Sequence, residues 1–230
     1  MTNADTSKSE IDRLGVRLRE SVSPHDLRLL DTYRLRFASA YEEVLQAIKT
    51  TTGIDVSGRP AKSTTAIVDK LSRESIRLSQ MQDIAGCRIV VADMENQNTL
   101  AAKLSALFID AVTSDRREKP SHGYRAIHII VHHADRTVEI QVRTQLQHLW
   151  AEHSEKLADK FGIAVKYGGG PEDIRQRLEA LSKNIGFVEL LEANSVNNAN
   201  LEAGRMILSN LKTNVQTALA DLLTTAGVKP

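Results

Sequence analysis

Hydrophobic and polar residues alternate along the segment 119–144, which reads KPSHGYRAIHIIVHHADRTVEIQVRT. The alternation predicts two β-strands, about 124–132 and 136–143, joined by a turn at 133–135. Side chains on a strand point alternately to its two faces, and one face of each strand here is aliphatic. The opposite faces carry Tyr124, Ala126 and His128 on the first strand, and Glu139, Gln141 and Arg143 on the second. So varied a polar face is typical of a functional site.

Apolar residues at steps of three and four predict helices in much of the remaining chain. The predicted helices are 8–22, 23–51, 63–77, 94–108, 145–161, 172–194 and 201–225. The second of them begins with the N-cap Ser23, followed by Pro24, and ends at Gly53. Further strands are predicted in the segment IDVSGRP (54–60) and at 84–92 and 109–113. Alternating strands and helices predict an α/β (α+β) fold, with a mixed β-sheet flanked by helices.

Breaks in this pattern divide the chain into three regions. We expect an N-terminal helical arm over 1–53, the main domain over 54–165 and a C-terminal helical extension over 171–230. The segment KYGGGP (166–171) ends the main domain, because glycine and proline interrupt regular structure. The polar segment NSVNNAN (194–200) joins the last two helices, which predicts an antiparallel helical hairpin. We expect this hairpin to be structural, with homo-oligomerisation through the terminal helices as the alternative.

Composition narrows the class of protein. Of the 230 residues, 41% are hydrophobic and 26% are charged, which is ordinary for a globular protein. The net charge of +1 argues against a strongly electrostatic partner for the chain as a whole. The single cysteine, Cys87, lies in an apolar run and is predicted to be part of the core. A polar N-terminus and the lack of an apolar run of membrane-spanning length predict a soluble cytoplasmic protein.

Charged residues gather around the predicted strand at 84–92. The segment before it carries Arg59, Lys62, Lys70, Arg73 and Arg77, which suit phosphate binding, although charge alone favours a solvated helix face. Asp83 precedes the strand, and Gly86 and Arg88 share one of its faces. Asp83 together with Glu139 fits a Mg²⁺-dependent transfer, in which one acid binds the ion and the other accepts a proton from the attacking hydroxyl. The combination of these features predicts a phosphate-transfer site.

The chain resembles the synthetase domain of RelA/SpoT proteins, especially the single-domain small alarmone synthetases. Five segments carry the resemblance in the family's order over about 56–160: GRPAKSTTAIVDKL, MQDIAGCRIVV, HGYRAIH, VEIQVRT and HLWAEH. The resemblance implies a nucleotidyltransferase-like synthetase fold and a Mg²⁺-dependent enzyme of the stringent response. The implied reaction moves the β,γ-pyrophosphate of ATP to the 3′-hydroxyl of GDP or GTP, giving (p)ppGpp and AMP.

The resemblance also implies a role for each candidate residue. Arg59 and Arg88 would stack on the adenine of ATP, and Lys62, Lys70 and Arg73 would bind its phosphates. Asp83 would bind Mg²⁺, with Glu139 as the second candidate metal ligand. Glu139 would position or deprotonate the 3′-hydroxyl. The residues implied around the acceptor are Tyr124 on its base, His128 on its phosphates or ribose, and Lys119, Gln141, Arg143 and Glu152.

The approach to the acceptor strand departs from the family pattern. The family has an Asp-Tyr segment and a Pro-Lys-x-Asn-Gly loop, whereas this chain reads SDRREKPSHG over 114–123. GDP or GTP is the preferred acceptor. One alternative is a toxic relative that modifies the tRNA 3′ end or adenosine nucleotides, with Arg116, Arg117, Lys119 and Arg125 on a nucleic-acid backbone. The other is a catalytically inactive nucleotide-binding regulator. Because no His-Asp hydrolase segment precedes the match, we expect the chain not to break down its product.

Overall fold

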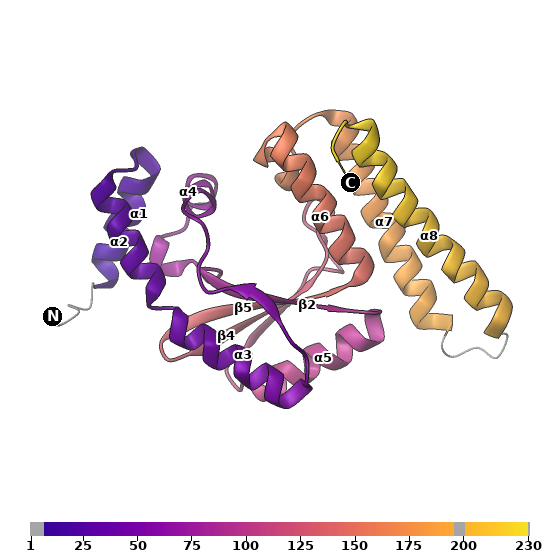
Figure 1. Cartoon of the computed structure of the whole chain (residues 1–230), viewed down its shortest axis with the longest axis horizontal. Coiled ribbons are helices and arrows are strands. Elements are labelled where there is room, and N and C mark those ends of the chain that lie inside the picture. Colours follow the sequence, from indigo (N-terminus) through magenta and orange to yellow (C-terminus); the bar gives the residue numbers. More distant parts are fainter. Residues whose placement is uncertain (1–6, 196–200, 230) are drawn as a thin grey trace. The chain divides into compact units, whose positions relative to one another are not determined.

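The structure of the chain is a computed structural model that describes residues 7–195 and 201–229 (Figure 1). Its first half contains α1 (Lys8–Glu20), α2 (Pro24–Leu35), α3 (Ala38–Thr52), β1 (Ser57–Arg59), α4 (Thr64–Arg73), β2 (Ala85–Val91) and α5 (Met94–Leu107). Its second half contains β3 (Val112–Asp115), β4 (Ile127–His133), β5 (Arg136–Thr144), α6 (Gln145–Phe161), α7 (Glu172–Ser195) and α8 (Leu201–Thr225). The strands form a mixed five-stranded sheet in the order β1-β2-β5-β4-β3, which confirms the predicted α+β fold.

The chain forms two compact units, each assembled from separate stretches. The first unit contains 1–89, 104–112 and 129–141, and the second contains 90–103, 113–128 and 142–230. Strands β4 and β5 each contribute residues to both units, because the divisions fall at 128/129 and 141/142.

The first unit has a helix on each side of β1 and β2. Figure 1 shows α3 and α4 on opposite sides of these strands. Strand β1 pairs antiparallel with β2, with Gly58 opposite Cys87. The Cys87 side chain is buried, and burial is the main cause that raises the pKa of its thiol to about 12. Cys87 is therefore a core residue, as predicted.

The N-terminal helical region is interrupted where one continuous helix was predicted over 23–51. Helix α2 ends at Leu35 and α3 begins at Ala38. Between them, the backbone N–H groups of Arg36 and Phe37 donate to carbonyls three residues earlier, so the turn tightens and the helix changes direction. Phe37 is buried against the edge of the Tyr33 ring, at 5.3 Å between ring centroids. Packing of these rings fixes the break. The sequence has no glycine or proline there that would signal it.

Among the other boundaries that differ from the prediction, three have a cause in the local backbone. Helix α4 ends at Arg73, four residues early, because the backbone of Glu74 is extended at φ −110° and ψ 140°. Strand β3 starts three residues late, after a turn in which the Ala111 N–H donates to the Phe108 carbonyl. Strand β4 also starts three residues late, so Tyr124 lies outside it, in a turn that its N–H closes on the Ser121 carbonyl at 2.9 Å. Positive φ angles of 51° at His122 and 90° at Gly123 make that turn too tight for a strand.

The hairpin of β4 and β5 is joined by two residues, Ala134 and Asp135. Both have positive φ, 46° and 59°, which identifies a type I′ turn. This turn matches the right-handed twist of the two strands, and it therefore fixes the register that places Glu139 and Gln141 on one face. Neither residue is glycine, so the turn stores backbone strain.

We predict that Ala134→Asn stabilises the chain by about 0.5–1 kcal/mol, because asparagine tolerates positive φ better than alanine does. The free energy of unfolding in urea measures the change. The same replacement at the exposed Ala102, inside α5, is the control and should destabilise, since asparagine is a weaker helix former. Destabilisation by both replacements would contradict the assignment of the turn.

The second unit contains a bundle of α6, α7 and α8, which lie side by side in Figure 1. Its core is mostly aliphatic, with buried side chains that include Leu157, Ile185 and Leu219, and it also contains Trp150. Helices α7 and α8 occupy nearly the predicted ranges, while most of the predicted connection 194–200 lies outside the described residues. Within the described ranges, no helix has both the length and the apolar character needed to cross a bilayer.

A buried polar network joins α5, α6 and α7 in this unit. Gln147 of α6 donates to the carboxylate of Glu189 at 3.0 Å, and Gln97 of α5 donates to the Gln147 side-chain oxygen at 2.8 Å. The hydroxyl of Thr144 also donates to Glu189. All four side chains are buried, and burial raises the pKa of Glu189 despite these bonds. Because removing one partner leaves a buried polar group unsatisfied, the network fixes α7 against the start of α6.

Candidate active site

Asp83 is held between two lysines in the first unit. Lys62 Nζ lies 2.6 Å from one carboxylate oxygen and Lys70 Nζ lies 2.8 Å from the other. The three side chains are 13–21% exposed, so the cluster is mostly shielded from water and still open to a ligand. Burial raises the pKa of Asp83, but the charges of Lys62 and Lys70 and their hydrogen bonds outweigh burial and lower it to about 2. The carboxylate is therefore ionised at neutral pH.

The local backbone explains how the cluster forms. Ser63 caps α4, its hydroxyl accepting from the Ala66 N–H, and this start places Lys70 two turns along the helix. The Lys62 N–H donates to the Ile84 carbonyl at 2.7 Å, which ties the loop after β1 to the residue beside Asp83. Two distant pieces of chain are thus joined by a backbone hydrogen bond next to the ion pairs.

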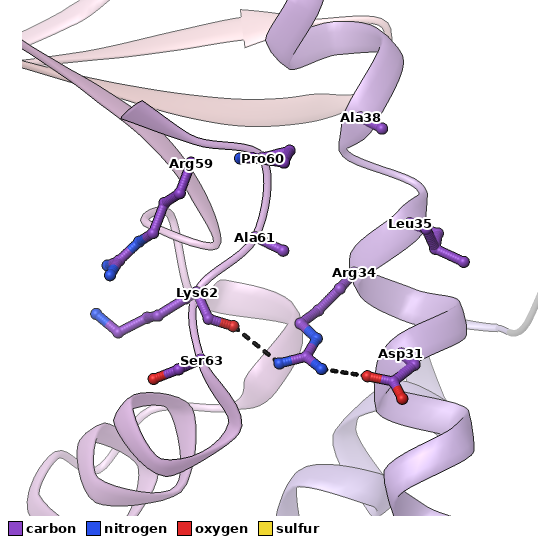
Figure 2. Close-up of a pocket in the computed structure, with 9 residues that line it drawn as sticks. All are labelled: Asp31, Arg34, Leu35, Ala38, Arg59, Pro60, Ala61, Lys62 and Ser63. Carbon is purple, nitrogen blue, oxygen red and sulfur yellow. Dashed lines mark hydrogen bonds and ion pairs between the residues drawn. The ribbon is translucent and has the colours of Figure 1, made fainter. Parts of the chain in front are cut away.

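Arg34 of α2 supports the same loop from its other side. Its guanidinium donates to the Lys62 carbonyl at 3.0 Å and to the Thr64 hydroxyl at 3.2 Å, and it also pairs with Asp31. Figure 2 shows Arg34 reaching the loop, while the side chains of Arg59 and Lys62 extend from it together in one direction. A pocket of about 530 Å³ lies here, lined by Asp31, Arg34, Leu35, Ala38, Arg59, Pro60, Ala61, Lys62 and Ser63. Arg34 was not among the predicted site residues, because nothing in the sequence places α2 beside residue 62.

In the sheet, Arg59 and Glu139 lie on either side of Gly86, which has no side chain. Arg59 of β1 is paired with Gly86 of β2. A Cβ on Gly86 would lie 3.5 Å from the Cβ of Glu139 and 3.0 Å from its carbonyl oxygen. Because directly paired residues share a face, Arg59 and Glu139 point to the same side with a gap between them. The predicted role of Gly86, to allow close approach, fits this geometry.

Two more predicted residues share that face. Arg88 lies two residues after Gly86 on β2, and its buried Nε has no hydrogen-bond partner among residues 7–195 and 201–229. An unsatisfied buried donor is costly, which is consistent with a guanidinium arranged for a ligand. On β5, the Gln141 amide donates to Glu139 at 2.7 Å and so orients its carboxylate.

The second unit brings together three residues implied for the acceptor. The Tyr124 hydroxyl lies 2.8 Å from His128 Nε2, and Arg143 donates to the same hydroxyl at 2.9 Å. The Arg143 guanidinium also lies 5.0 Å from the centre of the Tyr124 ring. His128 and Arg143 are only 5% and 6% exposed, so this cluster is a fixed part of the fold.

The remaining predicted residues lie outside these two clusters. Arg73 pairs with Asp69 and Glu74 on α4 and the residue after it. Lys119 is exposed in the loop before Tyr124. Glu152 is exposed on α6, where it lies 3.4 Å from His148.

The carboxylate of Asp83 fits a Mg²⁺ ion that the protein shares with substrate phosphates. No group of three or more His, Cys, Asp or Glu side chains suited to a metal exists among the described residues. Mg²⁺ keeps several waters and commonly binds through one or two carboxylates together with substrate phosphates. Asp83, with Lys62 and Lys70 beside it, suits an ion of this kind better than a metal held by protein alone.

Residues 58–161 match a family model described as a region found in RelA / SpoT proteins. The chain carries a RelA/SpoT region. This region includes β1, α4, β2, the β4–β5 hairpin and α6, and therefore almost every residue described above. Arg34 and helix α7 lie outside it.

Curated relatives of the chain occur in mycobacteria. An uncharacterized protein of Mycobacterium tuberculosis is 35% identical over 177 residues, which cover 73% of this chain and 64% of that protein. An uncharacterized protein of Mycobacterium bovis matches with the same identity and coverage. The chain thus spans less than two thirds of the length of these relatives.

Solved structures share the fold of most of this chain. Small alarmone synthetase 1 from Bacillus subtilis, bound to its product pppGpp, superimposes with a TM-score of 0.60 at 23% identity, covering 73% of this chain and 96% of that chain. A GTP pyrophosphokinase family protein from Streptococcus pneumoniae gives 0.54 at 23% identity, covering 80% and 98%. A Streptococcus mutans protein gives 0.53 at 27% identity, covering 79% and 98%. The fold is that of the small alarmone synthetases.

Proposed function

We propose that the chain transfers the β,γ-pyrophosphate of ATP to the 3′-hydroxyl of GDP or GTP, producing (p)ppGpp and AMP. The observation that carries the proposal is the ionised Asp83 between Lys62 and Lys70, inside a RelA/SpoT region. Two ammonium groups and a carboxylate in one shielded cluster suit a triphosphate with its metal ion. The fold shared with small alarmone synthetases supports the same reaction.

Each candidate site residue of the first unit has a part in the proposed reaction. Lys62 and Lys70, which pair with Asp83 in the chain alone, bind the phosphates of ATP, and Asp83 would hold the Mg²⁺ ion. When bound, the ion neutralises charge on the phosphates. Arg88, with Arg59 on the same face, supplies a flat guanidinium for the adenine ring. Arg73 adds a positive charge at the end of α4.

The transfer is a single displacement at phosphorus. The 3′-oxygen of the acceptor forms a bond to the β-phosphorus of ATP, and the bond from that phosphorus to the oxygen bridging the α-phosphorus breaks. AMP leaves with the electron pair of that bond. Glu139 accepts the proton of the 3′-hydroxyl, while Gln141 holds the carboxylate in place. Positioning and charge neutralisation supply most of the rate, so no covalent intermediate with the protein is required.

In this proposal, the second unit binds the acceptor. Tyr124 offers an aromatic ring for stacking on guanine, and its hydroxyl is fixed by His128 and Arg143. His128 and Arg143 also offer hydrogen-bond donors for ribose or phosphate oxygens. Lys119 and Glu152 remain candidates for outer contacts. The Bacillus subtilis synthetase with pppGpp bound supports a guanosine nucleotide as the acceptor.

The alternative with tRNA as acceptor depends on the basic residues of the loop before Tyr124. Arg117 is bound to Asp115 and donates to Gln97 at 3.0 Å, and its side chain is 13% exposed. Arg125 donates to Ser182 and to the Arg117 carbonyl. Because these two arginines are engaged within the fold, Arg116 and Lys119 are the basic residues left for a nucleic-acid backbone. That number is low for a protein that binds nucleic acid through phosphate contacts.

A panel of acceptors tests the proposal. The chain is incubated with ATP labelled at the γ-phosphate, Mg²⁺ and one acceptor: GDP, GTP, an adenosine nucleotide or deacylated tRNA. We expect label on GDP and GTP. Label on tRNA or on adenosine nucleotides alone would replace the proposed acceptor, and no labelled acceptor at all would favour the inactive nucleotide-binding regulator.

A further inference from the structure

Helix α7 is bonded to both neighbours of Tyr124 through one serine. The Arg125 Nε donates to the Ser182 carbonyl at 3.1 Å and to its hydroxyl oxygen at 3.0 Å. The Ser182 hydroxyl in turn donates to the Gly123 carbonyl at 2.6 Å. Ser182 is buried, so these bonds are protected from water. The residues before and after Tyr124 are therefore both held by the same side chain.

Two glycines make room for this arrangement. A Cβ on Gly186, one turn after Ser182 on α7, would lie 2.8 Å from the Arg125 guanidinium carbon. A Cβ on Gly123 would lie 2.7 Å from the Trp150 ring and 3.2 Å from the Ser182 Cβ, and the φ of 90° at Gly123 also disfavours a side chain. The loop can approach α7 this closely because both positions lack a side chain. We call these contacts of Gly123 and Arg125 with Ser182 the α7 clamp.

The α7 clamp extends to the rest of the loop. The other end of the Arg125 guanidinium donates to the Arg117 carbonyl at 2.6 Å. Arg125 thus connects the beginning of the loop, its end and α7, all within the second unit. Tyr124 gains a fixed backbone on both sides, in addition to the hydroxyl contacts with His128 and Arg143.

We propose that α7, which lies outside the matched RelA/SpoT region, positions Tyr124 through this clamp and thereby sets the affinity for the acceptor nucleotide. The inference rests on the proposed function, because Tyr124 is the residue assigned to the acceptor base. Ser182 and Arg125 are positioning residues, since their bonds fix the backbone on both sides of Tyr124. Loss of the clamp releases the loop and leaves the cluster of Asp83, Lys62 and Lys70 intact.

Steady-state kinetics of Ser182→Ala and Arg125→Lys test the role of the clamp. Alanine removes both hydroxyl bonds of Ser182, and lysine keeps the charge but cannot bridge Ser182 and Arg117. We expect the KM for GDP or GTP to rise about tenfold in each variant, because hydrogen bonds to a charged group are lost, while kcat and the KM for ATP stay unchanged. The control Lys183→Ala alters an exposed neighbour on α7 and should leave every constant unchanged.

Trp150 supplies a second readout that does not depend on activity. It is the only tryptophan of the chain, it lies against Gly123, and its N–H donates to the Leu178 carbonyl of α7 at 2.8 Å. Its fluorescence should become more accessible to acrylamide in Ser182→Ala and Arg125→Lys, and not in Lys183→Ala. If the unaltered chain makes no (p)ppGpp, the proposed function fails, and the fluorescence still decides whether the clamp holds the loop.

Two results would overturn the proposed role of α7. One is unchanged KM for the acceptor in both variants, whatever the fluorescence shows. The other is a parallel change in kcat or in the KM for ATP, since that marks general destabilisation of the fold. Unchanged acrylamide quenching in both variants would overturn the clamp itself.

Discussion

Glu139→Gln should abolish most of the transfer, lowering kcat on the order of 100- to 10,000-fold. Glutamine keeps the size of the side chain and can still accept the hydrogen bond from Gln141, but it cannot accept the proton of the 3′-hydroxyl. The KM for ATP should change little, because the lost interaction develops in the transition state and not in the bound substrate. Release of AMP, followed by chromatography under saturating nucleotides, measures the effect.

The control for this variant is Glu42→Gln, which makes the same chemical change at an exposed position on α3. It should leave kcat unaltered. Both proteins should unfold at nearly the same urea concentration as the unaltered chain, since glutamine keeps the size of the Glu139 side chain and its hydrogen bond with Gln141. AMP release by Glu139→Gln at more than a tenth of the original rate would show that another group accepts the proton.

Asp83→Asn should lower both activity and stability. The replacement leaves Lys62 and Lys70 facing each other without the carboxylate that separates them, which should cost about 2–4 kcal/mol of unfolding free energy. Activity should fall by at least about 100-fold, because in the proposed reaction Asp83 is the protein ligand of the ion that neutralises the phosphates. Urea unfolding measures the first effect and AMP release at varied Mg²⁺ concentration measures the second.

The pH dependence of the free energy of unfolding measures the contribution of the ionised Asp83 independently of activity. Its pKa of about 2 in the folded chain is lower than the ordinary value near 4, so its contribution is fully present above pH 4 and is lost as the pH falls from 4 towards 2. That contribution to the free energy of unfolding is on the order of 2–3 kcal/mol. In the Asp83→Asn variant, the free energy of unfolding should not fall by this amount between pH 4 and pH 2. Asp69→Asn, which breaks an ion pair between Asp69 and Arg73 on α4, is the control and should cost less than about 1 kcal/mol. Equal costs for the two variants would contradict the special role of Asp83.

Much of the fold could be predicted because its signals are local. Alternation located β5, and the hydrophobic stripes located α6, α7 and α8 within a residue at each end. The features that were missed are not marked by the alternation of strands or by the apolar stripes of helices. The break at Arg36 and Phe37 has no local breaker and is fixed by ring packing. The late start of β4 follows from a turn with positive φ at His122 and Gly123, which the alternation of apolar and polar residues after it does not reveal.

The candidate site shows the same division. Residue types and their order predicted Asp83, Lys62 and Lys70 as one group, and the structure brings them together. The sequence could not show that Arg34 supports this loop from α2. It also could not show that Arg117 and Arg125 serve the fold, because their partners lie 20 and 57 residues away. A basic loop looks the same in sequence whether its arginines bind a ligand or the protein itself.

In the proposed reaction, two phosphate groups move together from ATP to a ribose hydroxyl. Mass spectrometry of the nucleotides after incubation with ATP, Mg²⁺ and GDP tests it most directly. We expect an acceptor that has gained two phosphates, together with an equal amount of AMP. Gain of one phosphate with release of ADP, or gain of a nucleotidyl group with release of pyrophosphate, would contradict it.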